Sequence, residues 1–148
     1  MKIKIGLIII SGTILISWGI KTKKESLAEK PLPIIGTWKL ISGTLIEKGD
    51  TTITWYTKNI SFIKIINDTH FAFLSHDLNK GKDSSASYSS GGGSYSLKNN
   101  EYTEHLEYCS ARQWEGNDFS FTISIRNDTL TQKGIEKVAD AGVDRLNI

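Results

Sequence analysis

The sequence predicts an all-β domain, an antiparallel up-and-down barrel of about eight strands. Apolar and polar residues alternate over most of residues 36–133 with the period of two that a strand requires. Gly, Asn and Asp interrupt this alternation at the short intervals typical of hairpins. No window of the same range has a sustained helical period. A meander of this kind closes into a barrel or stacks as a sandwich, and the barrel is favoured because closure removes exposed strand edges.

Residues 1–28 have the pattern of a signal peptide. Lys2 and Lys4 precede an apolar run from Ile5 to Ile20, whose 16 residues are fewer than the roughly 20 of a membrane-spanning helix. Ser26-Leu27-Ala28 offers small residues for cleavage before Glu29. An uncleaved anchor is the alternative, favoured by positive charge directly after the run at Lys21, Lys23 and Lys24. In both cases we expect export to the periplasm or the extracellular space.

Charge and cysteine content narrow the function classes. Residues 29–148 hold 13 basic and 15 acidic residues, so the positive net charge of the whole chain belongs to its first segment. A mildly acidic domain without a basic run is a poor candidate for nucleic-acid binding. Cys109 is the only cysteine, which excludes an intrachain disulfide. With no cysteine near the apolar run, a lipid-anchored lipoprotein is not expected.

Residues 29–35 are predicted to be an extended lead-in, because Pro31 and Pro33 cannot continue a helix. The barrel domain is expected over residues 36–148. Its predicted strands are Thr37–Ile46, Thr51–Tyr56, Asn59–Ile66, His70–Ser75, Ser94–Leu97, Glu101–Cys109, Phe119–Ile125 and Thr129–Lys133.

The connections follow from their residue types. Asn67-Asp68 and Asn127-Asp128 are predicted tight turns, because Asn and Asp tolerate the positive φ of hairpin turns. The polar stretch 77–94 is a predicted mobile loop at the barrel mouth, with little apolar surface to offset the entropy of ordering it. Residues 134–142 are the one candidate for a helical turn.

Gly36-Thr37-Trp38 resembles the Gly-x-Trp triplet that opens the first strand of lipocalins. The ordered stretches GTWKLISG, KIINDTHFAF, GGGSYSL, NEYTEHLEYC and FTISIRNDTL resemble the lipocalin-like domains of uncharacterised exported bacterial proteins. The resemblance implies that Trp38 plugs the barrel floor and that Gly36 allows close approach.

Two departures from the lipocalin pattern concern the end of the domain and one loop. Lipocalins stack a late arginine on the first-strand tryptophan, and Arg145 is the only late arginine here. The last strand of such domains runs further than three residues beyond this position, so we expect a barrel that is incomplete at its C-terminal end. The Thr-Asp-Tyr loop of lipocalins is absent.

The strand Glu101–Cys109 carries the main functional prediction. Regular alternation points Tyr102, Glu104, Leu106 and Tyr108 inward, and the other face, with His105 and Cys109, outward. A carboxylate inside a barrel predicts the polar anchor of a ligand cavity. The alternative is a Glu104 near the mouth, satisfied by water or by Lys64.

The candidate cavity lining is therefore mostly aromatic, although these side chains could equally be packed core. It comprises Phe71, Phe73, Tyr95, Tyr102, Glu104, Tyr108 and Phe121. No metal or cofactor is expected, because the three histidines, His70, His76 and His105, lack ligand spacing. Gly91-Gly92-Gly93 leads into a strand and not a helix, so it does not predict a phosphate loop.

The sequence thus predicts a non-catalytic exported carrier or binder of a small apolar ligand. No Gly-x-Ser-x-Gly elbow or other role-complete set of catalytic residues is present. The alternative is a structural or protein-interaction module of the cell envelope with a filled barrel. Oligomeric state stays open, and no membrane span is expected once the signal is removed.

Overall fold

The computed structural model describes residues 32–148 apart from residues 83 and 85. The predicted signal segment and residues 29–31 of the lead-in lie outside the described residues. The regular structure of the described chain is almost entirely antiparallel strand: β1 Gly36–Lys39, β2 Ser42–Glu47, β3 Asp50–Trp55, β4 Ile60–Ile66, β5 His70–Asp77, β6 Tyr88–Lys98, β7 Glu101–Cys109, β8 Asp118–Arg126, β9 Thr129–Val138 and β10 Val143–Asn147. Two short 3-10 turns, η1 Arg112–Trp114 and η2 Ala139–Ala141, complete it.

All ten strands belong to one sheet, in the order β1-β4-β5-β6-β7-β8-β9-β10-β2-β3. β1 and β2 are separated only by Leu40 and Ile41, yet they lie near opposite ends of this order. The Leu40 N–H donates to the Phe62 carbonyl of β4, and the Ile41 carbonyl accepts from Tyr56 after β3. One bent strand therefore links both ends of the sheet and holds it curled.

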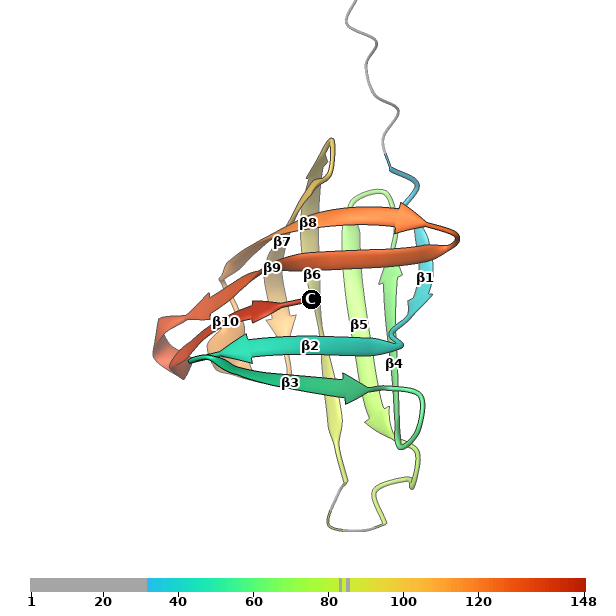
Figure 1. Ribbon diagram of the computed structural model, residues 1–148, viewed down its shortest axis with the longest axis vertical. Coiled ribbons are helices and arrows are strands. Elements are labelled where there is room, and N and C mark those ends of the chain that lie inside the picture. The colour runs from blue at the N-terminus through green and yellow to red at the C-terminus, as the bar shows by residue number, and fades with distance from the viewer. Residues whose placement is uncertain (1–31, 83, 85) are drawn as a thin grey trace, which may run out of the picture.

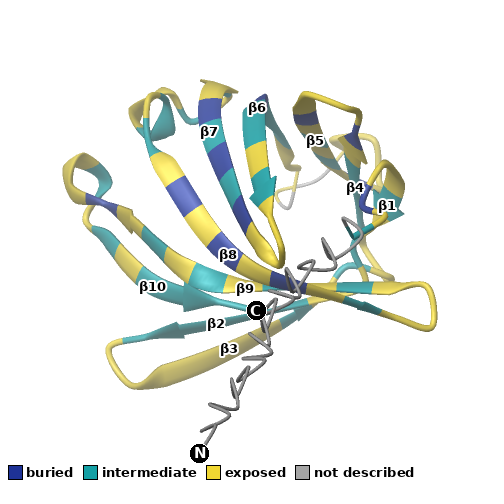
Figure 2. Ribbon diagram, turned by 90° about the horizontal axis from the view of Figure 1, so that it is seen from above, coloured by how far each residue is buried: buried dark blue, intermediate teal, exposed yellow. Residues whose placement is uncertain are grey.

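The curled sheet forms a half-barrel, seen from above in Figure 2. In Figure 1, β2, β3, β8, β9 and β10 run across the view, whereas β4, β5 and β6 run along it. The core lies on the concave side, which is the inner face. It is formed by nine buried apolar side chains: Ile34, Ile66, Phe71, Tyr102, Leu106, Phe119, Phe121, Ile123 and Val138.

The all-β antiparallel class is confirmed, but the strand count is ten and not about eight. The predicted first strand is divided at its bend, and β10 was not predicted. The predicted helical turn 134–142 is also wrong for most of its length, because β9 continues to Val138. Only glycine fits at position 134 of that strand, because a Cβ there would lie 2.3 Å from the Ser120 carbonyl oxygen.

Two connections differ from the prediction. β6 begins at Tyr88, so the polar stretch between strands is confined to residues 78–87. Asn127 and Asp128 have the expected positive φ, at 47° and 58°. Asn67 and Asp68 do not, because the Asn67 side chain closes that turn by accepting from the N–H groups of Thr69 and His70 at 2.9 and 2.8 Å.

The pairing of β6 with β7 contains a β-bulge. Gly92 lies opposite Tyr108 and Gly93 opposite Leu106, so Glu107 is the extra residue. A Cβ on Gly93 would lie 1.9 Å from the His105 carbonyl oxygen, so only glycine fits this close approach. Beyond the bulge, the alternation of β7 shifts by one residue.

Candidate functional site

A largely buried ion pair lies on the inner face. Lys64 of β4 pairs with Glu104 of β7, and the Lys64 ammonium also donates to the Gln132 side-chain oxygen at 3.0 Å. The same ammonium lies 5.2 Å from the Phe71 ring centre and 5.3 Å from that of Tyr102. The Glu104 carboxylate is therefore satisfied by Lys64, the partner named in the sequence-based alternative, although that alternative placed Glu104 near the barrel mouth and the structure buries it. The Lys64 ammonium is bound in turn by the Glu104 carboxylate, the Gln132 amide and the faces of the Phe71 and Tyr102 rings.

Tyr102 is the least satisfied polar residue of this cluster. The residue is 1% exposed, and in the described part of the chain its hydroxyl is the only buried side-chain polar atom without a hydrogen bond of good geometry, although the Glu104 carboxylate lies beside it. Burial raises the pKa of the Tyr102 hydroxyl most, followed by the negative charge of Glu104 and by hydrogen bonding to that carboxylate, so the phenol stays neutral. A buried hydroxyl without a good hydrogen bond lowers the stability of the fold by about 1–3 kcal/mol, because its desolvation is not compensated, and it requires a physical explanation.

An aromatic row borders the ion pair on the inner face. Phe73 lies directly opposite Lys64 across the β4–β5 pair, and its ring stacks on Phe62 at 5.8 Å between centres. Tyr56 meets Phe62 edge-on at 5.6 Å. Phe62, Phe73 and Tyr56 are only partly buried. The row therefore offers accessible aromatic surface next to a polar group.

Most predicted lining residues lie on the inner face. Phe71, Tyr102, Glu104 and Phe121 are buried there. Tyr95 is half-buried, with its ring centre 5.2 Å from that of Tyr102, while its hydroxyl donates to the Asn67 carbonyl. Phe73 lies on the same face. The structure thus brings six of the seven predicted residues together on one face of the sheet.

Tyr108 is the exception, and its predicted inward orientation is wrong. It lies on the outer face with 68% of its surface exposed, because the bulge at Glu107 shifts the alternation of β7. Cys109 is displaced in the opposite sense and packs against the core, although the sequence placed it outside. Alternation alone could not reveal this, because the glycine that enables the bulge belongs to another strand.

Tyr108 instead borders a hollow of about 390 Å³ on the outer face of β5, β6 and β7. Gly92 lies between Ala72 and Tyr108 in the sheet, so small residues form its floor. Exposed Tyr88 and Leu74 stand on the same face. The three consecutive glycines therefore serve close packing and leave a shallow surface groove, not an anion site.

Sequence reasoning missed a second polar cluster on the inner face. Arg145 of β10 forms an ion pair with Glu136 of β9 at 2.8 Å, and Asn147 donates to the same carboxylate at 2.9 Å. The Arg145 guanidinium lies 5.2 Å from the Trp114 ring centre. The late arginine thus stacks on a tryptophan, but on Trp114 of η1 and not on Trp38. To predict this pair, both an extension of β9 beyond Lys133 and the strand β10 beside it would have been needed.

Trp38 and Gly36 lie at the start of the sheet. Trp38 packs against the core, and its indole N–H donates to the Ile34 carbonyl at 2.7 Å. Gly36 has a φ of 148°, and no atom lies within 4 Å of the position a Cβ would take. The role of Gly36 is therefore conformational and not the close approach that the lipocalin resemblance implied.

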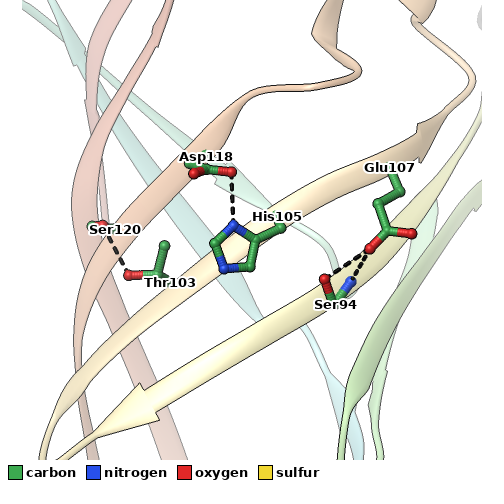
Figure 3. A network of polar contacts seen from close by, with 6 residues as sticks. All are labelled: Ser94, Thr103, His105, Glu107, Asp118 and Ser120. Carbon is green, nitrogen blue, oxygen red and sulfur yellow. Dashed lines mark hydrogen bonds and ion pairs between the residues drawn. The ribbon is translucent and has the colours of Figure 1, made fainter.

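The outer face of β6, β7 and β8 carries pairs of polar side chains (Figure 3). His105 faces Asp118 at 2.8 Å, Thr103 faces Ser120 at 2.9 Å, and Glu107 accepts from the Ser94 hydroxyl at 2.7 Å. Hydrogen bonds from Ser94 lower the pKa of Glu107. Within residues 32–148, gaps aside, no three histidine, cysteine or acidic side chains gather into a metal-binding group.

The deepest part of the inner face is tightly filled. Between Ile34, Ile66 and Tyr102 there is no room for a water molecule, and the Gln132 side chain borders the same space. Access to the Tyr102 hydroxyl therefore requires a side chain to move. Among the side chains that border this space, Gln132 is unbranched and accepts a hydrogen bond from Lys64.

The chain matches no protein-family model, no curated protein and no solved structure. No helix in the described residues is long and apolar enough to cross a membrane.

Proposed function

We propose that this chain is an exported, non-catalytic, lipocalin-like protein that binds a small neutral ligand with an apolar body. One observation carries the proposal: the buried Tyr102 hydroxyl lacks a well-formed hydrogen bond, although it lies beside the Tyr95 ring and the Lys64–Glu104 pair. A polar atom of a ligand would satisfy this hydroxyl and remove its desolvation cost.

The charges around Tyr102 select the ligand's polar group. A carboxylate there would face Glu104, and an ammonium would face Lys64, so either charge would disturb the existing ion pair. A neutral phenol can donate and accept. The ligand that fits is an alcohol, phenol or carbonyl compound.

The aromatic row of Tyr56, Phe62 and Phe73 supplies the apolar side of the site. Phe73 is the cross-strand neighbour of Lys64, so a ligand lying on this row would reach the polar cluster with one end. The Gln132 amide would turn away from Lys64 as the ligand's polar group enters. Burial of an apolar body then supplies about 25 cal/mol per Å² of binding free energy.

A second candidate function is an interaction or structural module with a filled interior. The lack of space for water between Ile34, Ile66 and Tyr102 favours it. In this case Gln132 never leaves Lys64, and the Tyr102 hydroxyl remains without a well-formed hydrogen bond.

Calorimetric titration distinguishes the two functions, with 1-naphthol as a neutral probe and 1-naphthoate as a charged one of similar shape. The ligand-binding proposal predicts saturable binding of naphthol and much weaker binding of naphthoate. Gln132→Ala should strengthen naphthol binding, because it removes a side chain that borders the filled space beside Tyr102. Absence of naphthol binding to both the wild type and Gln132→Ala would support the filled module.

A further inference from the structure

β3 is an edge strand without the usual protection against pairing. It is hydrogen-bonded to β2 alone among the described strands. Its sequence, DTTITW, has no proline, glycine or lysine and has one charge, at its first residue. Natural edges usually carry such residues because an open edge accepts a further strand.

The hydrogen bonds of β2 show which backbone groups of β3 remain open. Thr44 donates its N–H to Ile148 at 2.7 Å and accepts the Ile148 N–H at 2.9 Å, so both its groups are used on the β10 side. Ile53 lies directly opposite Thr44 and therefore directs its own N–H and C=O away from β2. The Tyr56 N–H donates to the Ile41 carbonyl on the β2 side. The even-numbered residues of this segment therefore face β2, and the odd-numbered ones face away from it. Thr51, Ile53 and Trp55 thus face the open edge.

Apolar side chains accompany these open groups. Ile53 is 57% and Trp55 58% exposed, and both project from the outer face. The same face continues with Ile46, Leu146 and Ile135, which are direct neighbours across β2, β10 and β9. An edge strand flanked by apolar surface is the usual setting for strand addition.

We infer that β3 pairs with β3 of a second copy of this chain, giving a two-fold symmetric dimer with a continuous sheet. With Ile53 on the axis, Ile53 faces Ile53 and Thr51 faces Trp55, and each of these pairs is hydrogen-bonded by the open groups. Thr52 faces Thr54 on the inner face. No charged residue faces another within residues 51–55, so the strand is complementary to itself.

The argument for a second copy is this charge pattern. An uncharged strand centre selects an uncharged partner strand, and β3 supplies one with the correct alternation of apolar and threonine side chains. The dimer does not depend on the proposed ligand site, because β3 contributes no residue of the Lys64–Glu104–Tyr102 cluster.

Ile53→Pro tests the inference directly. Proline at this position removes an N–H that makes no bond within the monomer but donates once across the dimer axis, so the dimer loses two symmetry-related bonds. Sedimentation equilibrium over a range of concentrations should show a monomer–dimer equilibrium for the wild type. Ile53→Pro should weaken association by at least about tenfold.

Two further variants keep the test decisive. Ile53→Lys should also give monomers, because it brings two lysines together at the axis, and it serves if the proline variant does not fold. Ile135→Thr removes an exposed apolar side chain three strands away and should leave the dimer intact. A wild type that stays monomeric, or a dimer unaffected by both Ile53 variants, would overturn the inference.

Discussion

The carbonyl oxygen of His105 lies only 1.9 Å from the position that a Cβ on Gly93 would occupy. Only glycine permits this close approach of the two strands, which accompanies the bulge at Glu107 and the outward orientation of Tyr108. One glycine of β6 thus decides which face the end of β7 presents.

Gly93→Ala should therefore destabilise the protein by about 3 kcal/mol or more, the upper end of the overpacking range, because backbone must move. Gly43→Ala is the control, since its nearest atom, Tyr56 Cε2, would lie 3.4 Å away. Urea unfolding of the two variants measures the difference. Equal midpoints would show that β7 tolerates a different register.

The Lys64–Glu104 pair should behave as a unit. Lys64→Met or Glu104→Leu alone leaves a buried unpaired charge and should cost about 3–5 kcal/mol of unfolding free energy. The double variant should recover most of this loss, because neither charge remains. A double-mutant cycle from chemical unfolding checks it. Additive losses would mean that the two groups are solvated separately.

Trp38 and Trp55 should differ sharply in their contribution to stability. Trp38 packs on the core, so Trp38→Ala should cost about 3–5 kcal/mol. Trp55 is 58% exposed, so Trp55→Ala should change stability by about 0.5 kcal/mol or less. Thermal melts at low protein concentration compare them as monomers. Equal, small shifts would remove Trp38 from the core.

Asp77 should make stability depend on pH in the acid range. Its carboxylate accepts from the Gly81 N–H at 2.9 Å and the Ser87 N–H at 3.2 Å, and these bonds lower its pKa. Because the folded pKa is lowered, the stabilisation is complete above the unfolded value of about 3.9 and is lost as pH falls through the folded value.

Asp77→Asn should therefore be less stable than wild type at neutral pH, with the difference shrinking at pH values below about 4. Urea midpoints measured from neutral to acid pH provide the test. A difference that stays constant with pH would assign the effect to shape and not to charge.

Local pattern predicted the inner face well where strands are regular. Tyr102 and Glu104 lie inside because β7 alternates strictly from Glu101 to Leu106. The prediction failed at Tyr108 because a bulge depends on the register between two strands. It failed at residues 134–138 because Gly134 resembles a strand breaker, whereas its actual role is close approach to Ser120. The sequence alone does not reveal which backbone a glycine will meet.

The candidate site was predictable in part for the same reason. Glu104 was expected inside because its position follows from alternation, whereas Lys64 was named as its partner only in the alternative that placed Glu104 near the barrel mouth. The Glu136–Arg145 pair was not expected, because it requires β9 to pair with a strand that was not predicted. The lack of a well-formed hydrogen bond at the Tyr102 hydroxyl depends on three-dimensional packing and leaves no pattern in the sequence.

Tyr102→Phe tests the proposed ligand site most directly, by its affinity for 1-naphthol measured by calorimetry beside its thermal stability. The variant loses a hydroxyl that lacks a well-formed hydrogen bond, so the ligand-free protein should be as stable as wild type or more so. Its affinity for naphthol should fall about three- to tenfold, the value of one hydrogen bond. Tyr108→Phe, on the outer face, should bind naphthol like wild type. Unchanged affinity in Tyr102→Phe would contradict a ligand held at this hydroxyl.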